Sequence, residues 1–183
     1  MQRISSLTNL QSNYIRDQMV ESFSDSQNHI NSISLIHEKL LESPDHERIN
    51  FSGYIKSLVD DLYKSHRVNP NKISKNIQAE NIFLDIDTAT LCGLIINELI
   101  SNSLKHAFPN GRDGMVGIEM HQDDNCIEMF ISDDGIGLSE RVNFNEPETL
   151  GLQLVKTLVN EINGKIELKN YKGTKFNIKL NKN

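Results

Sequence analysis

The chain contains little cysteine, no long apolar run and no basic tract. Its two cysteines, Cys92 and Cys126, are far apart and form no Cys-x-x-Cys pair, so we expect no disulfide framework and a reduced, cytoplasmic setting. No stretch approaches about 18 consecutive apolar residues, and the N-terminus lacks a charged segment followed by an apolar one. The sequence therefore predicts neither a membrane span nor a secretory signal.

The charge pattern argues against two further classes of protein. Lysine and arginine number 19 against 25 aspartate and glutamate residues, and no run of five basic residues occurs, so we do not expect nucleic-acid binding. The six histidines form no cluster with metal-ligand spacing, so a zinc site is not predicted. With 183 residues, 37% of them hydrophobic, the chain can form one compact domain and a small appendage.

The first part of the chain, residues 1–44, has the pattern of a helical hairpin. Apolar residues recur at steps of three and four from Ile4 to Tyr14 and from Met19 to Leu40. Two such stripes joined by a short polar break predict two antiparallel helices, whose apolar faces we expect to pair with a second hairpin in a dimer. The first helix is about two turns shorter than the second, so we expect further residues upstream of Met1.

Residues 48–183 follow a different pattern, in which strand-like alternation and helical periodicity succeed one another. The interpretation is an α+β fold: a two-layer α/β sandwich with a largely antiparallel mixed sheet packed by helices. Asp87 is the expected N-cap of the longest helix. The expected helices are Phe51–Leu62, Thr88–Ala107 and Leu150–Ile162, and the expected strands lie at 49–51, within 73–86, and at 115–121, 126–132, 165–168 and 174–180.

The longest predicted helix is apolar except along one edge. Glu98 and Asn102 are four residues apart and share a face, and Lys105 lies about one turn further on. A carboxylate, an amide oxygen and an ammonium group in a row suit a phosphate ligand that carries Mg²⁺. Taken alone, this pattern is also compatible with a solvated helix edge.

Three glycine-containing segments complete the pattern. Asp133 to Gly137 follows a strand, and its carboxylate could accept a hydrogen bond from an exocyclic amine such as that of adenine. Gly151 begins a helix whose backbone N–H groups could bind phosphate, after a long polar stretch, 139–148, that could form a lid. Gly173 and Thr174 open the last strand. Each could instead be an ordinary turn, and none matches a Walker loop or a dinucleotide fingerprint.

Together these segments resemble the nucleotide-binding domain shared by histidine kinases, type II topoisomerases, Hsp90 and the mismatch-repair ATPase. The stretch from Asn97 to Phe108 resembles the N motif of that superfamily, Asp133 to Gly137 its first glycine motif, and Leu150 to Val155 its second. The resemblance covers roughly 48–183 and implies the Bergerat fold, with ATP and Mg²⁺ as cofactors. Thr149 stands where the second glycine motif usually begins with glycine.

The hairpin resembles one particular subfamily within this superfamily. The stretches 5–12 and 36–40 are similar to a histidine kinase subfamily whose acceptor motif reads His-Arg-x-x-Asn-Asn, which we expect upstream of Met1. The resemblance implies a sensor histidine kinase that acts as a homodimer through this hairpin, with a response regulator receiver domain as partner and a sensor domain upstream. Without its acceptor, this chain should bind ATP but not phosphorylate itself.

The resemblance also implies a role for each site residue. Asn102 is expected to coordinate Mg²⁺, Glu98 to orient metal or water, and Lys105 to contact phosphates, and these three form the predicted catalytic set. The carboxylate of Asp133 is expected to bind the adenine amine. The remaining expected nucleotide contacts are Asn97, His106, Gly135, Gly137, Leu138, Gly151, Leu152 and Thr174.

Three other functions remain open from the sequence. The first is a serine-directed kinase that controls a sigma factor, although such proteins lack a helical hairpin. The second is a hydrolytic ATPase in which Glu98 is the general base. The third is a dimeric scaffold that has kept the fold and lost turnover.

Overall fold

The computed structural model describes residues 27, 30, 31, 33–35, 38, 48–123, 125–138, 144, 149–170 and 172–181. Residues 27, 30, 31, 33–35 and 38 are helical, in agreement with the second half of the predicted hairpin, and Leu35 packs against the core. The first predicted helix lies outside the described residues. Within the described part of the chain, no helix has both the length and the apolar character that crossing a bilayer requires.

The described helices and strands follow the order predicted from the sequence. Their bounds are β1 (Ile49–Asn50), α2 (Phe51–Ser65), β2 (Ile73–Ala79), β3 (Phe83–Leu84), α3 (Ile86–Asn102), a π-helical turn (Ser103–Ala107), a 3-10 turn (Pro109–Gly111), β4 (Gly114–Gln122), β5 (Cys126–Asp133), α4 (Leu150–Glu161), β6 (Lys165–Asn170) and β7 (Thr174–Asn181).

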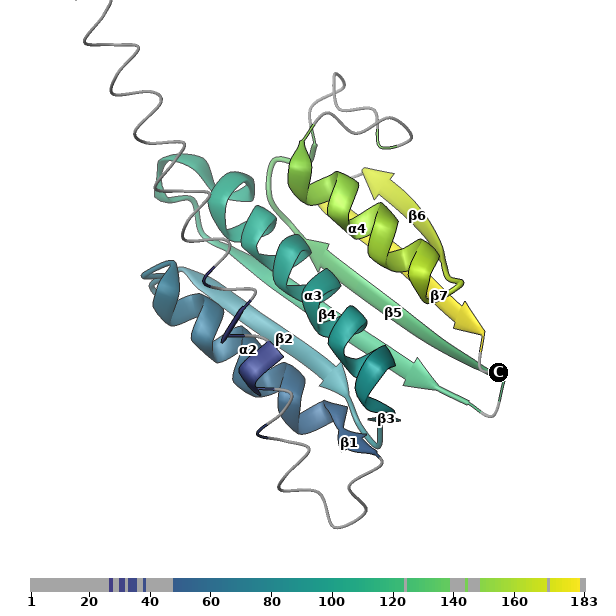
Figure 1. Cartoon of the computed structure of the whole chain (residues 1–183). Helices are drawn as coiled ribbons and strands as arrows, with labels where there is room; N and C mark the ends of the chain where they lie inside the picture. Colours follow the sequence, from purple (N-terminus) through teal and green to yellow (C-terminus); the bar gives the residue numbers. More distant parts are fainter. Residues whose placement is uncertain are drawn as a thin grey trace, which may run out of the picture.

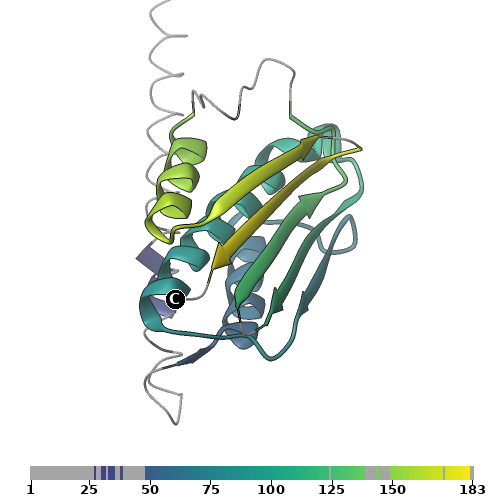
Figure 2. The same cartoon turned by 90° about the vertical axis from the view of Figure 1, so that its right-hand side faces the viewer.

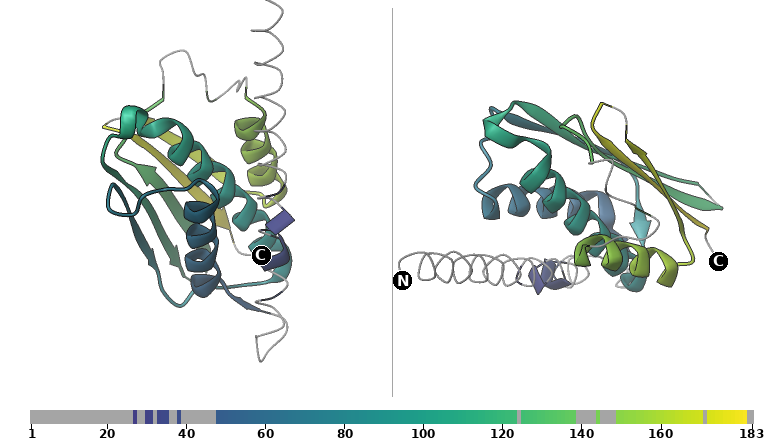
Figure 3. Two further views of the ribbon diagram at one scale, coloured as in Figure 1. Left: turned by 90° about the vertical axis from the view of Figure 1, so that its left-hand side faces the viewer. Right: turned by 90° about the horizontal axis from the view of Figure 1, so that it is seen from above.

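Five strands form one mixed sheet in the order β2-β4-β5-β7-β6, and β1 and β3 form a separate two-stranded pair. Only β2 and β4 run parallel, and the other neighbours in the sheet are antiparallel. Helices α2, α3 and α4 all cover the same face of this sheet, with α3 in the middle (Figures 1 and 2). The predicted two-layer α/β sandwich is therefore confirmed, and Figure 3 shows its two layers from above.

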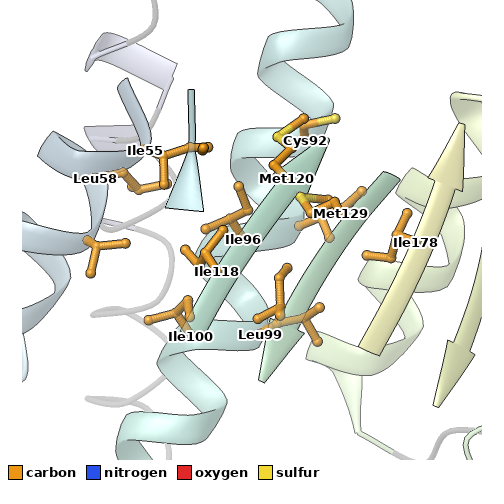
Figure 4. Packing of buried hydrophobic residues seen from close by; sticks show 14 of the residues in the cluster. Ile55, Leu58, Cys92, Ile96, Leu99, Ile100, Ile118, Met120, Met129 and Ile178 are labelled. Carbon is orange, nitrogen blue, oxygen red and sulfur yellow. The ribbon is translucent and has the colours of Figure 1, made fainter. Parts of the chain in front are cut away.

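The core lies between the helices and the covered face of the sheet. Side chains alternate along β5, where every second residue from Ile127 to Asp133 is buried, as a strand with one covered face requires. Ile96, Leu99 and Ile100 of α3 point toward strand residues such as Met129 (Figure 4). Because α3 is covered by α2, α4 and the sheet, almost its whole second half is buried.

The longest helix begins two residues before its predicted start. The N-cap is Asp85, whose carboxylate accepts a hydrogen bond from the Thr88 backbone N–H at 2.8 Å, so the assignment of Asp87 as N-cap is wrong. Both aspartates are good helix starters, but only Asp85 precedes the first turn, and Asp87 lies inside it, where its charge favours the helix dipole. The α-helix also ends at Asn102 rather than at Ala107.

The two free cysteines lie in different surroundings. Cys92 is fully buried on α3, and burial raises the pKa of its thiol to about 12, so it acts as a small apolar side chain, as expected. Cys126 is only half-buried at the start of β5, and its thiol donates to the Asp123 carboxylate, which raises its pKa. Sequence alone predicts a small buried apolar residue at each cysteine, and this prediction is confirmed for Cys92 and wrong for Cys126.

Gly93 lets α2 and α3 approach closely. A Cβ at Gly93 would lie 2.3 Å from the Tyr54 hydroxyl oxygen and 2.9 Å from Cζ of its buried ring. We expect Gly93→Ala to lower the free energy of unfolding by about 1–3 kcal/mol, because the ring cannot move within a packed core. Gly53→Ala on α2 is the control: its nearest neighbour would be 3.9 Å away, so it should stabilise by about 0.4–1 kcal/mol. Equal urea midpoints for both variants would contradict this.

Candidate functional site

The second half of α3 carries the polar side chains that the sequence singled out. Asn97 and Glu98 are 1% and 8% exposed, and Asn102, the last α-helical residue, is half-buried. The Asn97 amide oxygen accepts a hydrogen bond from the buried Ser101 hydroxyl at 3.3 Å. This edge of α3 is therefore not the solvated helix face that the sequence left open, because three of its polar side chains, those of Asn97, Glu98 and Ser101, are buried.

A π-helical turn, Ser103–Ala107, follows directly on Asn102. Such turns are rare and are frequently found at functional sites. Their hydrogen bonds span five residues instead of four, so the side chains that follow point in other directions than in a regular α-helix. Lys105 is half-buried and His106 is exposed in this turn. The predicted continuation of a regular helix through Ala107 is therefore wrong, and the positions of Lys105 and His106 do not follow from α-helical spacing.

Asp133, the last residue of β5, is 8% exposed and accepts three hydrogen bonds. Its Oδ1 atom accepts from the backbone N–H groups of Gly135 at 3.0 Å and Thr174 at 3.2 Å. Its Oδ2 atom accepts from the Ser103 hydroxyl at 2.8 Å. Thr174 is the cross-strand partner of Asp133 in the β5–β7 pair. The carboxylate is thus held by three separate segments of the chain.

The loop after β5 lies directly against the π-helical turn. The Ile136 N–H donates to the Ala107 carbonyl at 3.0 Å, and a Cβ on Gly135 would lie 2.4 Å from both Cβ and O of Ala107. Gly137 has a φ of +75°, a conformation that favours glycine. Gly135 and Gly137 therefore allow a close approach and a turn beside Asp133.

The start of α4 lies beside the polar edge of α3. A Cβ on Gly151 would be 2.5 Å from Glu98 Oε2 and 3.7 Å from Asn102 Nδ2, so both side chains end near the same point. The Thr149 side chain makes no capping hydrogen bond to this helix. The first N–H groups of an α-helix have no partner within the helix, so this end of α4 can bind an anion.

The structure brings together residues from all four segments that the sequence singled out. Figure 1 shows the end of α3, the end of β5 and the start of α4 at the same end of the molecule. Asp133 lies close to the C-terminal end of α3, because Ser103, the neighbour of Asn102, donates a hydrogen bond to it. Two predicted contacts are partly or wholly in the core: Leu152 is 6% exposed, and Leu138 packs against the core.

Sequence reasoning missed Ser103 beside this site and a core contact made by Phe144 of the predicted lid. Ser103 is 8% exposed and bonded to Asp133. Its position in the sequence could have indicated burial, because it lies three residues after Ile100 and seven after Ile96 and so shares their apolar helix face. Phe144 falls in the predicted lid, 139–148, which otherwise lies outside the described residues. Its ring centroid is 5.4 Å from that of Phe176 on β7, and no signal in the sequence pointed to this pair.

The described residues include no group of three or more histidine, cysteine, aspartate or glutamate side chains that could hold a metal ion by themselves. Mg²⁺ commonly needs only one or two protein oxygens when phosphates and water supply the rest of its octahedral shell. The carboxylate of Glu98 and the amide of Asn102, which converge beside Gly151, fit this second kind of site.

Two family models match the chain. Residues 87–183 match the family described as histidine kinase-, DNA gyrase B-, and HSP90-like ATPase, and residues 1–66 match a family described as histidine kinase. The first match spans more than half of the chain and contains every residue of the site. The second match includes the predicted hairpin.

Several known proteins are similar to this chain. Sensor histidine kinase PdtaS of Mycobacterium tuberculosis is 30% identical over 151 residues, which are 81% of this chain and 30% of that protein. PdtaS of Mycolicibacterium smegmatis is 29% identical over 171 residues, or 91% of this chain and 34% of that protein. The chain thus spans about a third of the length of the curated relatives that it matches.

The solved structures agree in fold. The histidine kinase domain of the blue-light activated histidine kinase EL346 from Erythrobacter litoralis superposes with a TM-score of 0.76 at 21% identity, covering 85% of this chain and 74% of that domain. At this identity the likeness shows the fold alone. The family match and the sequence relatives carry the assignment: the chain belongs to the family of histidine kinase-, DNA gyrase B- and HSP90-like ATPases and comprises a histidine kinase catalytic region.

Proposed function

We propose that the domain at 48–183 binds Mg-ATP and transfers the γ-phosphate to a histidine on a dimerisation hairpin, from which it passes to an aspartate of a response regulator receiver domain. The observation that carries this proposal is that Asp133, Asn102 and Gly151 lie at one end of α3: Asp133 is bonded to Ser103, the neighbour of Asn102, and the Asn102 amide lies beside Gly151. A nucleotide has two chemically different ends, and the site offers a matching group for each.

The Asp133 end fits the adenine base. Ionised carboxylates only accept hydrogen bonds, and the adenine amine is a donor. The glycines that follow Asp133 permit a ligand to approach the backbone, and the exposed Ile136 offers an apolar surface nearby, being 62% exposed. Thr174 supports this end through its backbone N–H, which holds Asp133 in place.

The α4 end fits the phosphates. The N–H groups of the first turn of α4, at Gly151 and Leu152, would bind phosphate oxygens, and the buried side chain of Leu152 anchors that turn in the core. Lys105, from the π-helical turn, would supply positive charge to the phosphates, and the exposed His106 of the same turn would line the same edge. Phosphoryl transfer depends mainly on positioning and on charge neutralisation, so no covalent nucleophile is needed in this domain.

Mg²⁺, once bound to the phosphates, would neutralise their charge, with Asn102 as its direct protein ligand and Glu98 acting through water. Glu98 is nearly buried beside Gly151, so it can hold a water molecule close to the start of α4. The Glu98 carboxylate could also act as a general base for the attack of water on the γ-phosphate. ATP hydrolysis is therefore the alternative function of this site.

The partners follow from the N-terminal part of the chain. The match of residues 1–66 to a histidine kinase family supports a homodimer formed through the hairpin at 1–44, with a sensor domain upstream and a receiver domain as phosphate acceptor. We place the reaction in the cytoplasm, where response regulators would meet the kinase.

Replacing Asn102 by alanine tests the metal role. We expect Mg²⁺ to lower the dissociation constant for ATP in the unchanged chain. In Asn102→Ala the factor by which Mg²⁺ lowers this constant should be roughly ten times smaller, the equivalent of one lost interaction of about 1.4 kcal/mol. Metal-free binding should change little, because the base contacts remain. Calorimetric titration with ATP, in Mg²⁺ and in EDTA, measures both quantities.

Asn160→Ala, at an exposed position near the other end of α4, is the matched control and should bind as the unchanged chain does. Absence of ATP binding to the unchanged chain would exclude a nucleotide-dependent enzyme and favour the scaffold. Steady release of free phosphate from ATP would instead favour a hydrolytic ATPase.

A further inference from the structure

The Ser103 hydroxyl is the one side-chain donor among the described residues that reaches the Asp133 carboxylate. We infer that Ser103 is a positioning residue that sets the direction of Asp133 and thereby determines how strictly the site distinguishes a 6-amino from a 6-oxo purine nucleotide. This inference rests on the proposed function, since it assumes that the base lies at Asp133.

The hydrogen bonds of Asp133 support this inference. A carboxylate has about four acceptor directions, two on each oxygen. The described residues occupy both directions on Oδ1, through the N–H groups of Gly135 and Thr174, and one on Oδ2, through the Ser103 hydroxyl at 2.8 Å. The remaining acceptor direction is on Oδ2, beside the Ser103 hydroxyl, and it can receive one proton from a ligand.

The two ends of this carboxylate are held differently. Oδ1 is held by backbone groups on two sides, the loop after β5 and the start of β7, which no single side-chain change removes. Oδ2 is held by one rotatable hydroxyl, that of the buried residue Ser103. Rotation of the carboxylate about its Cβ–Cγ bond moves both oxygens together, so all three hydrogen bonds restrain it, and the bond from Ser103 is the one that a side-chain substitution can remove.

If the Asp133 carboxylate is held in one orientation, it can distinguish a hydrogen-bond donor from an acceptor on the base. Adenine presents an amine that donates, whereas a 6-oxo base presents an oxygen that would face Oδ2 with lone pair against lone pair. A 6-oxo base could still donate its ring N–H if the carboxylate turned toward it. The Ser103 hydrogen bond opposes that turn, so its loss should favour the 6-oxo base more than adenine.

The test compares ATP with inosine triphosphate, whose base carries oxygen in place of the amine. Dissociation constants for both are measured with Mg²⁺, by displacement of a fluorescent ATP analogue from the complete 183-residue chain. We expect Ser103→Ala to reduce the ratio of the two constants roughly tenfold, the effect of one hydrogen bond to a charged group. Thr90→Val is the control, since it removes a half-buried hydroxyl from the first turns of α3, where Thr90 bonds only the Ile86 carbonyl, and it should leave the ratio unchanged.

The outcomes separate this inference from the function on which it rests. An unchanged ratio in Ser103→Ala, with ATP still bound, overturns the role of Ser103 and leaves the function standing. If the unchanged chain binds no ATP, the function itself fails. Should Ser103→Ala not fold, Ser103→Cys retains a weaker donor of similar size and is expected to reduce the ratio by a smaller factor; an unaltered ratio there is equally a refutation.

Discussion

Replacement of Asp133 by asparagine should leave the fold largely intact and weaken ATP binding by roughly 10- to 150-fold, the range expected for one hydrogen bond to a charged group. The amide has the same shape as the carboxylate, and its oxygen can still accept from Gly135 and Thr174 at the Oδ1 position. Its NH₂ group must then take the Oδ2 position. There the Ser103 hydroxyl can turn and accept, but the adenine amine meets another donor.

The same change predicts an altered preference among nucleotides. A donor at the Oδ2 position matches the oxygen of a 6-oxo base, so Asp133→Asn should bind inosine triphosphate relatively better than the unchanged chain does. Titration with both nucleotides measures this, and thermal unfolding without nucleotide checks the fold.

Asp134→Asn is the matched control for this change. Asp134 is exposed, and its Oδ1 atom accepts from the Met115 N–H at 2.7 Å, which an amide oxygen can also do. We expect its ATP affinity and its selectivity to stay at the level of the unchanged chain. If Asp133→Asn binds ATP as tightly as Asp134→Asn does, the base does not lie at Asp133.

Gly173→Ala should destabilise the domain severely. Gly173 is buried with a φ of +110°, and a Cβ there would lie 2.0 Å from the carbonyl oxygen of Asp133 and 2.8 Å from Cα of Asp134. Backbone strain and overpacking each cost about 1–3 kcal/mol, and neither can be relieved by a side-chain rotation because the contacts are with backbone. Since β7 begins one residue later, relief would require β5 and β7 to separate at the Asp133–Thr174 pair.

Urea denaturation measures the loss, with Gly117→Ala as the control in the same sheet. The nearest neighbour of a Cβ at Gly117 would be the Ser132 hydroxyl at 2.8 Å, which can rotate away, and the φ of Gly117 is not positive. We expect that control to change stability by less than about 1 kcal/mol. A Gly173→Ala protein with the same urea midpoint as the control would show that the turn before β7 tolerates a side chain.

The sequence predicted the layers of the fold well, because periodicity reports which face of an element is covered. The helix predicted at 51–62 is α2, and its six apolar residues at helical spacing are all buried: Phe51, Tyr54, Ile55, Leu58, Val59 and Leu62. The alternation at 126–132 likewise corresponds to the buried and half-buried positions of β5. Errors occurred at element ends, where Asp85 and Asp87 are equivalent in type and only the three-dimensional path of the chain decides between them.

For the candidate site, too, the sequence predicted one part and the tertiary structure determined the other. Residue type and order along the chain were enough to select Glu98, Asn102, Asp133 and Gly151, because each carries a group that a nucleotide requires. The arrangement around them depends on contacts between distant residues. Ser103 and Asp133 are 30 positions apart, and Asp133 and Thr174 are 41 apart.

The sequence by itself determined the elements, the covered faces and the chemical groups of this protein, since these depend on residue type and local spacing. Only the tertiary structure decided that α3 ends in a π-helical turn, that Ser103 faces the Asp133 carboxylate, and that Glu98 and Asn102 meet at Gly151. The physical reason is that packing of α3 and α4 on one face of the sheet places these groups together, and such packing involves residues that no local pattern relates.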